Sequence, residues 1–183
     1  MKNSATGIVV WLTGLPASGK STLAERARDL LAERNIVCVI LDGDEMRAGP
    51  CSDLGFSPED RAENVRRAAE TARLLSSQGL VVVCALVSPY KRDRDAARSM
   101  MRGAPFIEAY VDCPVDICRS RDPKGHYEKA SRGDIPSFTG VTGPYEPPNR
   151  PDLHLRTDRR GSMIARRRSS MPSSRRRPAD GVA

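Results

Sequence analysis

The sequence has no apolar run long enough to cross a membrane, no paired cysteine motif and no internal repeat. Its longest apolar runs fall well short of the roughly 20 residues that a membrane-spanning helix needs. The five cysteines are odd in number and include no C-x-x-C pair, and three of them lie in or beside apolar runs. These absences predict reduced, mostly buried thiols, a cytoplasmic location and no membrane partner.

The excess positive charge lies at one end of the chain. The formal net charge is +7, and residues 159–183 hold eight arginines and a single acid, Asp180. The preceding 158 residues carry 22 basic and 22 acidic side chains, so this part is neutral. We therefore expect no nucleic-acid partner except through the basic C-terminal segment.

One segment carries a specific signal for phosphate binding. It fits the pattern G-x-x-x-x-G-K-S/T and consists of Gly14, Leu15, Pro16, Ala17, Ser18, Gly19, Lys20, Ser21 and Thr22. The two glycines permit backbone angles that turn N–H groups around phosphate oxygens, and the following helix N-terminus favours negative charge. Lys20 supplies a cation for the β- and γ-phosphates, and the Ser21 hydroxyl is placed to ligate Mg²⁺. The segment predicts binding of a nucleoside triphosphate with Mg²⁺. Because the apolar run at 8–12 leads directly into it, that run is not a cleaved secretory signal.

Apolar runs alternate with helical segments along the chain. Strands are predicted at 7–13, 36–41, 80–87, 106–112 and, weakly, 153–156, and helices near 20–34, 58–78, 91–102 and 114–120. Continuous apolar runs are typical of parallel strands buried on both faces. The sequence thus predicts an α/β fold with a doubly wound parallel sheet and helices on both faces. Residues 121–150 have little periodicity and many Gly and Pro, which favours a mobile lid over an active site.

The helix predicted at 58–78 has clear end signals and presents polar residues near its start. Ser57 is the expected N-cap, with Pro58 in the first turn and Gly79 beyond the end. Arg61 and Asn64 share a face near the positive helix end, which indicates a second anion-binding surface. Spacing alone equally allows them to be solvated helix residues.

Polar groups also follow two of the predicted strands. Asp44 and Ser88 would face the same crevice as the phosphate-binding loop, because ligands of open α/β sheets collect at the carboxyl ends of strands. Asp44 is placed to accept a hydroxyl proton or to hold a Mg²⁺-bound water, and Arg47 can clamp an anionic acceptor. An Asp at a strand end is as often a cap or turn residue, and Ser88 can equally cap the helix that follows.

Taken together, these segments resemble the adenylylsulfate kinase (APS kinase) family, from about residue 8 to Asp158. The matching blocks are L-D-G-D-x-x-R at 41–47, L-G-F-S-x-x-D-R-x-x-N-x-R-R at 54–67, V-S-P-Y at 87–90, C-P at 113–114, R-D-P-K-G at 121–125, F-T-G at 138–140 and P-Y-E-x-P at 144–148. The resemblance implies a P-loop kinase-type parallel five-stranded sheet with a lid segment. It also implies transfer of the γ-phosphoryl group of MgATP to the 3′-hydroxyl of adenosine 5′-phosphosulfate (APS), giving 3′-phosphoadenylyl sulfate (PAPS) for sulfate assimilation.

The same resemblance assigns roles to individual residues. Lys20, Asp44 and Ser88 are catalytic positions, and Arg121 faces ATP. The residues expected to contact APS are Asp44, Arg47, Phe56, Arg61, Asn64, Val87, Ser88, Lys124 and Phe138. Phe56 and Phe138 offer flat faces to an adenine ring, while the cations offset the phosphosulfate charge. Ser88 matches a serine described in the family as a phosphorylated intermediate. No base is evident beside it, so we favour a role short of covalent catalysis.

The resemblance also implies a homodimer and a separate ATP sulfurylase as a partner. Two other functions stay open: a different small-molecule P-loop kinase, and a nucleotide-binding protein with impaired catalysis.

The segment 159–183 departs from the family, which continues with a short amphipathic helix after Thr157 and Asp158. Here the chain is rich in arginine and serine with few apolar residues, so we expect a domain at 1–158 and a disordered tail at 159–183. In the family, the adenine of ATP packs near the segment that follows Thr157, so the tail bears on the completeness of the nucleotide pocket. A shifted reading frame, a functional basic tail and a truncated pseudo-enzyme are the three explanations.

Overall fold

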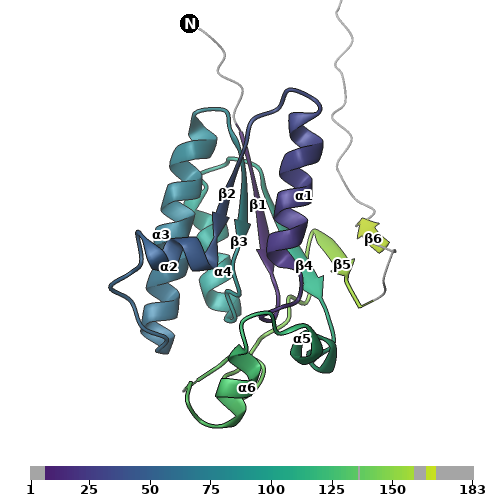
Figure 1. Ribbon diagram of the computed structural model, residues 1–183. Helices are drawn as coiled ribbons and strands as arrows, with labels where there is room; N and C mark the ends of the chain where they lie inside the picture. The colour runs from purple at the N-terminus through teal and green to yellow at the C-terminus, as the bar shows by residue number, and fades with distance from the viewer. Residues whose placement is uncertain (1–6, 136, 159–163, 168–183) are drawn as a thin grey trace, which may run out of the picture.

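A single twisted sheet forms the centre of the molecule (Figure 1). The computed structural model describes residues 7–135, 137–158 and 164–167. Within them the strands lie in the order β2-β3-β1-β4-β5-β6. Their bounds are β1 Ile8–Thr13, β2 Cys38–Asp42, β3 Val81–Ala85, β4 Phe106–Asp112, β5 Leu153–Arg156 and β6 Ile164–Arg167. Strands β1 to β5 pair in parallel, which confirms the predicted five-stranded parallel sheet.

Strand β6 was not expected from the sequence. It pairs antiparallel with β5, with Leu155 opposite Ala165, and lies inside the segment predicted to be disordered. The open edge of β5 offers unpaired N–H and C=O groups, which explains why a neighbouring stretch of backbone adds to it. The rest of that predicted tail, 159–163 and 168–183, lies outside the described residues.

Helices cover both faces of the sheet, as predicted. In Figure 1, α3 (Pro58–Ser77) and α4 (Lys91–Met100) lie together on one side and α1 (Lys20–Ala32) on the other. The core beneath α3 and α4 centres on Trp11, which is fully buried, and on the small residues of α3 that let the helix approach the sheet. The core beneath α1 contains Ala24 and Leu12.

The ends of α3 follow the predicted signals. Ser57 accepts a hydrogen bond on its Oγ from the backbone N–H of Asp60 at 3.1 Å, and Gly79 follows the helix with φ 88°. By contrast, the reading of Ser88 as a helix cap is wrong: α4 begins at Lys91 with Tyr90 at the N-cap position. The Ser88 hydroxyl instead accepts a hydrogen bond from the indole N–H of Trp11 at 3.1 Å.

Three short helices flank the ends of the strands. They are α2 (Gly43–Ala48), α5 (Val115–Arg121) and α6 (His126–Ser131), of which the sequence predicted only α5. Helix α6 belongs to the predicted lid segment, which shares a small core around Cys118, Tyr127 and Phe138, here called the lid core, with α5 and the phosphate-binding loop. Figure 1 shows α5 and α6 next to each other below the carboxyl ends of the strands.

The thiols agree with the sequence prediction. All five cysteines are free; four are buried and Cys38 is half-buried. Over the described part of the chain, no helix is both long enough and apolar enough to cross a bilayer.

Candidate active site

The phosphate-binding loop connects β1 to α1 and depends on its two glycines for different reasons. Gly19 has a left-handed backbone with φ 98°, as predicted, and a non-glycine residue, Ala17, is also left-handed with φ 57°. Gly14 is not left-handed; a Cβ there would lie 2.5 Å from the carbonyl oxygen of Val111. A side chain at Gly14 is therefore excluded by the close approach of β4 rather than by backbone angle.

Lys20 lies inside the turn of this loop. Its ammonium donates to the carbonyl oxygens of Gly14 at 3.0 Å and Leu15 at 2.8 Å, and 8% of the residue is exposed. Burial lowers the pKa of Lys20 from 10.5 to about 8, against the opposing effect of nearby negative groups such as Asp42 and Asp44. The lysine thus carries a charge that neutral carbonyls compensate only in part, which favours an incoming anion.

Two hard oxygen donors lie beside this lysine. The Ser21 hydroxyl donates to Oδ2 of Asp42 at 2.6 Å, and the other carboxylate oxygen of Asp42 accepts from the backbone N–H of Asp44 at 2.9 Å. Asp42 is thus the residue that caps α2, and Asp44 is not. A hydroxyl and a carboxylate oxygen next to a triphosphate site are a donor set that suits Mg²⁺, which usually keeps waters and takes one or two protein ligands.

One cavity of about 1550 Å³ joins this loop to the other predicted residues. It is lined by Lys20, Ser21, Asp42, Asp44, Arg47, Phe56, Arg61, Asn64, Val87, Ser88, Arg121, Lys124, Phe138 and Thr157, among others. All nine residues predicted to contact APS are in this set. Of the nine predicted loop residues, only Gly14, Leu15 and Ser18 do not line the cavity. Gly14 lies against the end of β4, Leu15 packs against the lid core, and Ser18 is fully buried.

An exposed aromatic ring with two guanidinium groups lies on one side of the cavity. Phe56 is 50% exposed, and the Cζ atoms of Arg47 and Arg61 lie 4.2 and 5.6 Å from its ring centroid. Arg61 also donates to the carbonyl oxygen of Ser137 at 2.8 Å, which ties α3 to the segment that carries Phe138. Phe138 itself is only 8% exposed, because its ring packs edge-on against Tyr127 with centroids 5.0 Å apart.

Asn64 is the polar residue of this side that lacks a protein partner. It is 6% exposed, and its buried Nδ2 atom has no hydrogen-bond acceptor among the described residues. The alternative that Asn64 is a solvated helix residue is therefore wrong. A buried amide donor without a partner is costly, and a ligand that accepts from it removes that cost.

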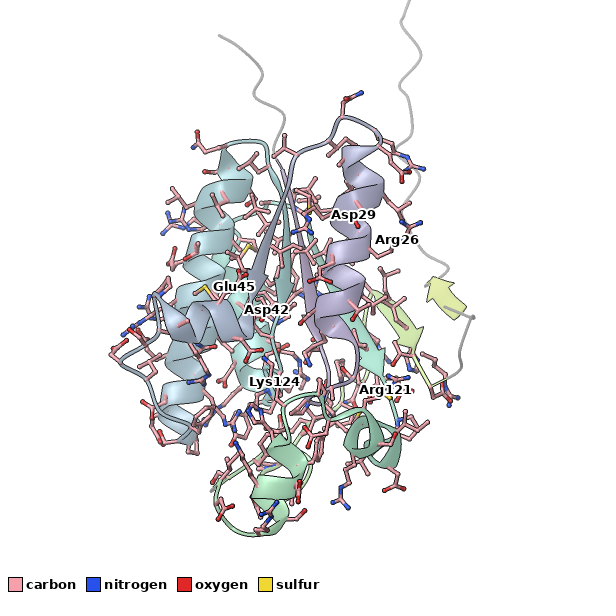
Figure 2. The ribbon with its side chains drawn as sticks, viewed as in Figure 1. Arg26, Asp29, Asp42, Glu45, Arg121 and Lys124 are labelled. Carbon is pink, nitrogen blue, oxygen red and sulfur yellow. The ribbon has the colours of Figure 1, made fainter. Side chains whose placement is uncertain are left out.

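Two cationic residues of the lid segment, Arg121 and Lys124, line the cavity and contact other parts of the site. Lys124 forms an ion pair with Asp44, and both side chains are largely exposed. Figure 2 shows Lys124 and Arg121 on the lid side, opposite Asp42 and Glu45 at the end of β2 and the start of α2. Arg121 donates to the carbonyl oxygen of Thr157 and to the Sγ atom of Cys113 at 3.5 Å.

Sequence reasoning assigned no role to two residues of this site, Asp42 and Thr157. Asp42 has a local signal, since it ends β2 two residues before Asp44. Thr157 has none: its side chain contacts the phosphate-binding loop from 139 positions away along the chain.

Comparison with known proteins identifies the family. A family model described as adenylylsulphate kinase matches residues 6–156. The chain belongs to that family. An adenylyl-sulfate kinase of Geotalea uraniireducens is 51% identical over 160 residues, covering 87% of this chain and 77% of that protein. A protein of Bacillus subtilis named as a probable adenylyl-sulfate kinase is 48% identical over 154 residues, covering 84% and 78%.

A solved structure of the family has the same fold. The APS kinase of Mycobacterium tuberculosis, in complex with AMPPNP and APS, superposes with a TM-score of 0.83 at 44% identity over 85% of this chain and 91% of that one. The resemblance that the sequence blocks indicated is therefore confirmed, as is the P-loop kinase fold.

Proposed function

We propose that this chain is an APS kinase that transfers the γ-phosphoryl group of MgATP to the 3′-hydroxyl of APS. The observation that carries the proposal is one continuous cavity with two different ends: a phosphate-binding loop with Lys20, and an aromatic and guanidinium cluster with the unpartnered amide of Asn64. Two nucleotides that bind at these ends would meet between Asp42, Asp44 and Ser88. Phosphoryl transfer needs mainly such positioning and charge neutralisation.

On the donor side, the loop amides and Lys20 would hold the β- and γ-phosphates. Ser21 would ligate Mg²⁺, with Asp42 receiving a metal-bound water or the ion itself, as their hydrogen bond at 2.6 Å supports. When bound, Mg²⁺ neutralises charge that develops on the phosphate oxygens. Lys20 would exchange its carbonyl acceptors for phosphate oxygens, so its charge becomes fully compensated only in the complex.

On the acceptor side, Phe56 would stack on the adenine of APS, since half of this residue is exposed and the guanidinium group of Arg47 lies near its ring. Arg61 and Lys124 would neutralise the phosphosulfate. Asp44 would accept the 3′-hydroxyl proton once Lys124 leaves its ion pair for the ligand, because that ion pair is solvent-exposed and weak. Phe138 would contribute an edge rather than a full stacking face, since its ring is mostly enclosed by the lid core.

Ser88 would act by position and not as a phosphoryl carrier. It is 3% exposed, and its Oγ already accepts from Trp11, while the backbone carbonyl of Ser88 is held by Arg94 at 2.8 Å. No base contacts its hydroxyl among the described residues. Incubation with MgATP alone should give no phosphoserine at position 88 by mass spectrometry.

Assembly and location are also part of the proposal, which we base on family membership. A homodimer, a separate ATP sulfurylase that supplies APS and a cytoplasmic location would fit this reaction. Sedimentation of the purified chain measures the first of these directly.

A coupled assay tests the function. The purified protein is incubated with MgATP and a panel of acceptors, and the products are separated and quantified. PAPS formation from APS is expected; phosphorylation of another acceptor, or ATP binding without transfer, would overturn the proposal. The Lys20→Ala variant should abolish transfer while circular dichroism shows an intact fold, because the lysine lines the cavity and is not part of a hydrophobic core.

A further inference from the structure

Thr157 follows β5 directly and contacts three parts of the site at once. Its backbone N–H donates to the carbonyl oxygen of Asp112 at 3.1 Å, which fixes it to the end of β4. Its Oγ1 donates to the carbonyl oxygen of Ser18 at 2.7 Å, and its own carbonyl oxygen accepts from the guanidinium group of Arg121. The residue thus joins the sheet, the phosphate-binding loop and the lid.

The bond to Ser18 controls the orientation of one peptide group. The Ser18 carbonyl and the Gly19 amide belong to the same planar trans peptide, so their C=O and N–H bonds point in opposite directions. Because the Ser18 carbonyl points toward Thr157, the Gly19 N–H points away from Thr157. Gly19 lines the cavity, and a loop N–H that points inward is a phosphate donor.

The backbone at this point needs such support. Ala17 and Gly19, on either side of Ser18, are both left-handed, with φ values of 57° and 98°. A non-glycine residue in that conformation persists only when its surroundings hold it.

We propose that Thr157 is a positioning residue for the donor nucleotide: its hydroxyl orients the Ser18–Gly19 peptide for the phosphates, and its carbonyl couples that peptide to Arg121 of the lid. The inference rests on the proposed kinase function and assigns a role to a residue outside the phosphate-binding motif. Arg121, which the family resemblance places facing ATP, lines the cavity and also donates to Thr157 and Cys113.

Two substitutions separate the hydroxyl from the methyl group. Thr157→Val keeps the shape and removes the donor, whereas Thr157→Ser keeps the donor and removes the methyl. Loss of one hydrogen bond changes a dissociation constant by about three- to tenfold. We therefore expect Thr157→Val to raise the dissociation constant for MgATP by that factor. The MgATP affinity of Thr157→Ser should stay within about twofold of the wild-type value. The KM for APS should be unchanged in both variants.

Two further readouts make the test independent of catalysis. MgATP affinity is measured by calorimetry without APS, so a wild-type protein that binds ATP but makes no PAPS overturns the proposed function and still tests Thr157. In the ligand-free protein, the amide resonance of Gly19 should shift in Thr157→Val and stay in place in Thr157→Ser. Three results would overturn the role assigned to Thr157. They are a wild-type MgATP affinity in Thr157→Val, an equal loss of MgATP affinity in Thr157→Val and Thr157→Ser, and an equal rise in the KM values for ATP and for APS.

Discussion

The buried ammonium of Lys20 predicts that MgATP binding weakens as the solution becomes alkaline. Burial lowers the pKa of Lys20 to about 8 in the ligand-free protein, where it has only carbonyl acceptors. The phosphates of ATP favour the charged form, so binding requires the lysine to be protonated. At a pH above the pKa of Lys20, the ligand-free protein must therefore take up a proton when it binds MgATP.

The size of this effect follows from the pKa. If only the protonated form binds, the apparent dissociation constant increases by the factor 1 + 10^(pH − pKa), which gives about an eightfold loss of affinity between pH 7.5 and pH 9. Phosphate groups with a second pKa of about 6 are already ionised over this range, so the ligand contributes little. Calorimetry in buffers of different ionisation enthalpy should show proton uptake approaching one per ATP at pH 9.

A substitution at the same position provides the control. Lys20→Arg keeps a positive charge at every pH in this range, so its MgATP affinity, although weaker, should not depend on pH. Constant wild-type affinity from pH 7.5 to pH 9, or the same slope in Lys20→Arg, would show that the lysine is already fully protonated and that the reasoning from burial is wrong.

Three further predictions concern the acceptor side and the fold. Arg61→Ala should raise the KM for APS at least about tenfold with little change in MgATP affinity, because this arginine lies beside Phe56 and holds the Ser137 carbonyl; equal effects on both substrates would contradict separate binding ends. Arg94→Met should lower the free energy of unfolding by about 3 kcal/mol, because it leaves Glu108 and two backbone carbonyls without their buried cation. Urea titration measures this free energy, and a loss below about 1 kcal/mol would refute the prediction. Ser57→Ala should cost about 1 kcal/mol and Ser57→Asp almost nothing, and similar losses in both would exclude the capping role.

The secondary structure was largely predictable because its signals are local. Most of the parallel strands are continuous apolar runs, whereas β5 is a short L-H-L-R stretch with a weak signal. Helix α3 has its capping serine and its terminating glycine within a few residues of its ends. Helices α2 and α6 were missed because each has six residues and too few turns for a periodic pattern. Strand β6 was missed because its pairing depends on the open edge of β5 and not on its own residues.

The sequence by itself determined the donor site, the fold class and the family, because the phosphate-binding motif and the blocks from 41 to 148 are contiguous patterns of residue types. The tertiary structure decided which groups act on one another. The contacts of Thr157 with Ser18, of Lys124 with Asp44 and of Trp11 with Ser88 join residues 139, 80 and 77 positions apart. Such contacts depend on how the ends of the strands and the lid meet in space, so no local pattern encodes them. The low pKa of Lys20 has the same origin, since it comes from burial that only the folded chain creates.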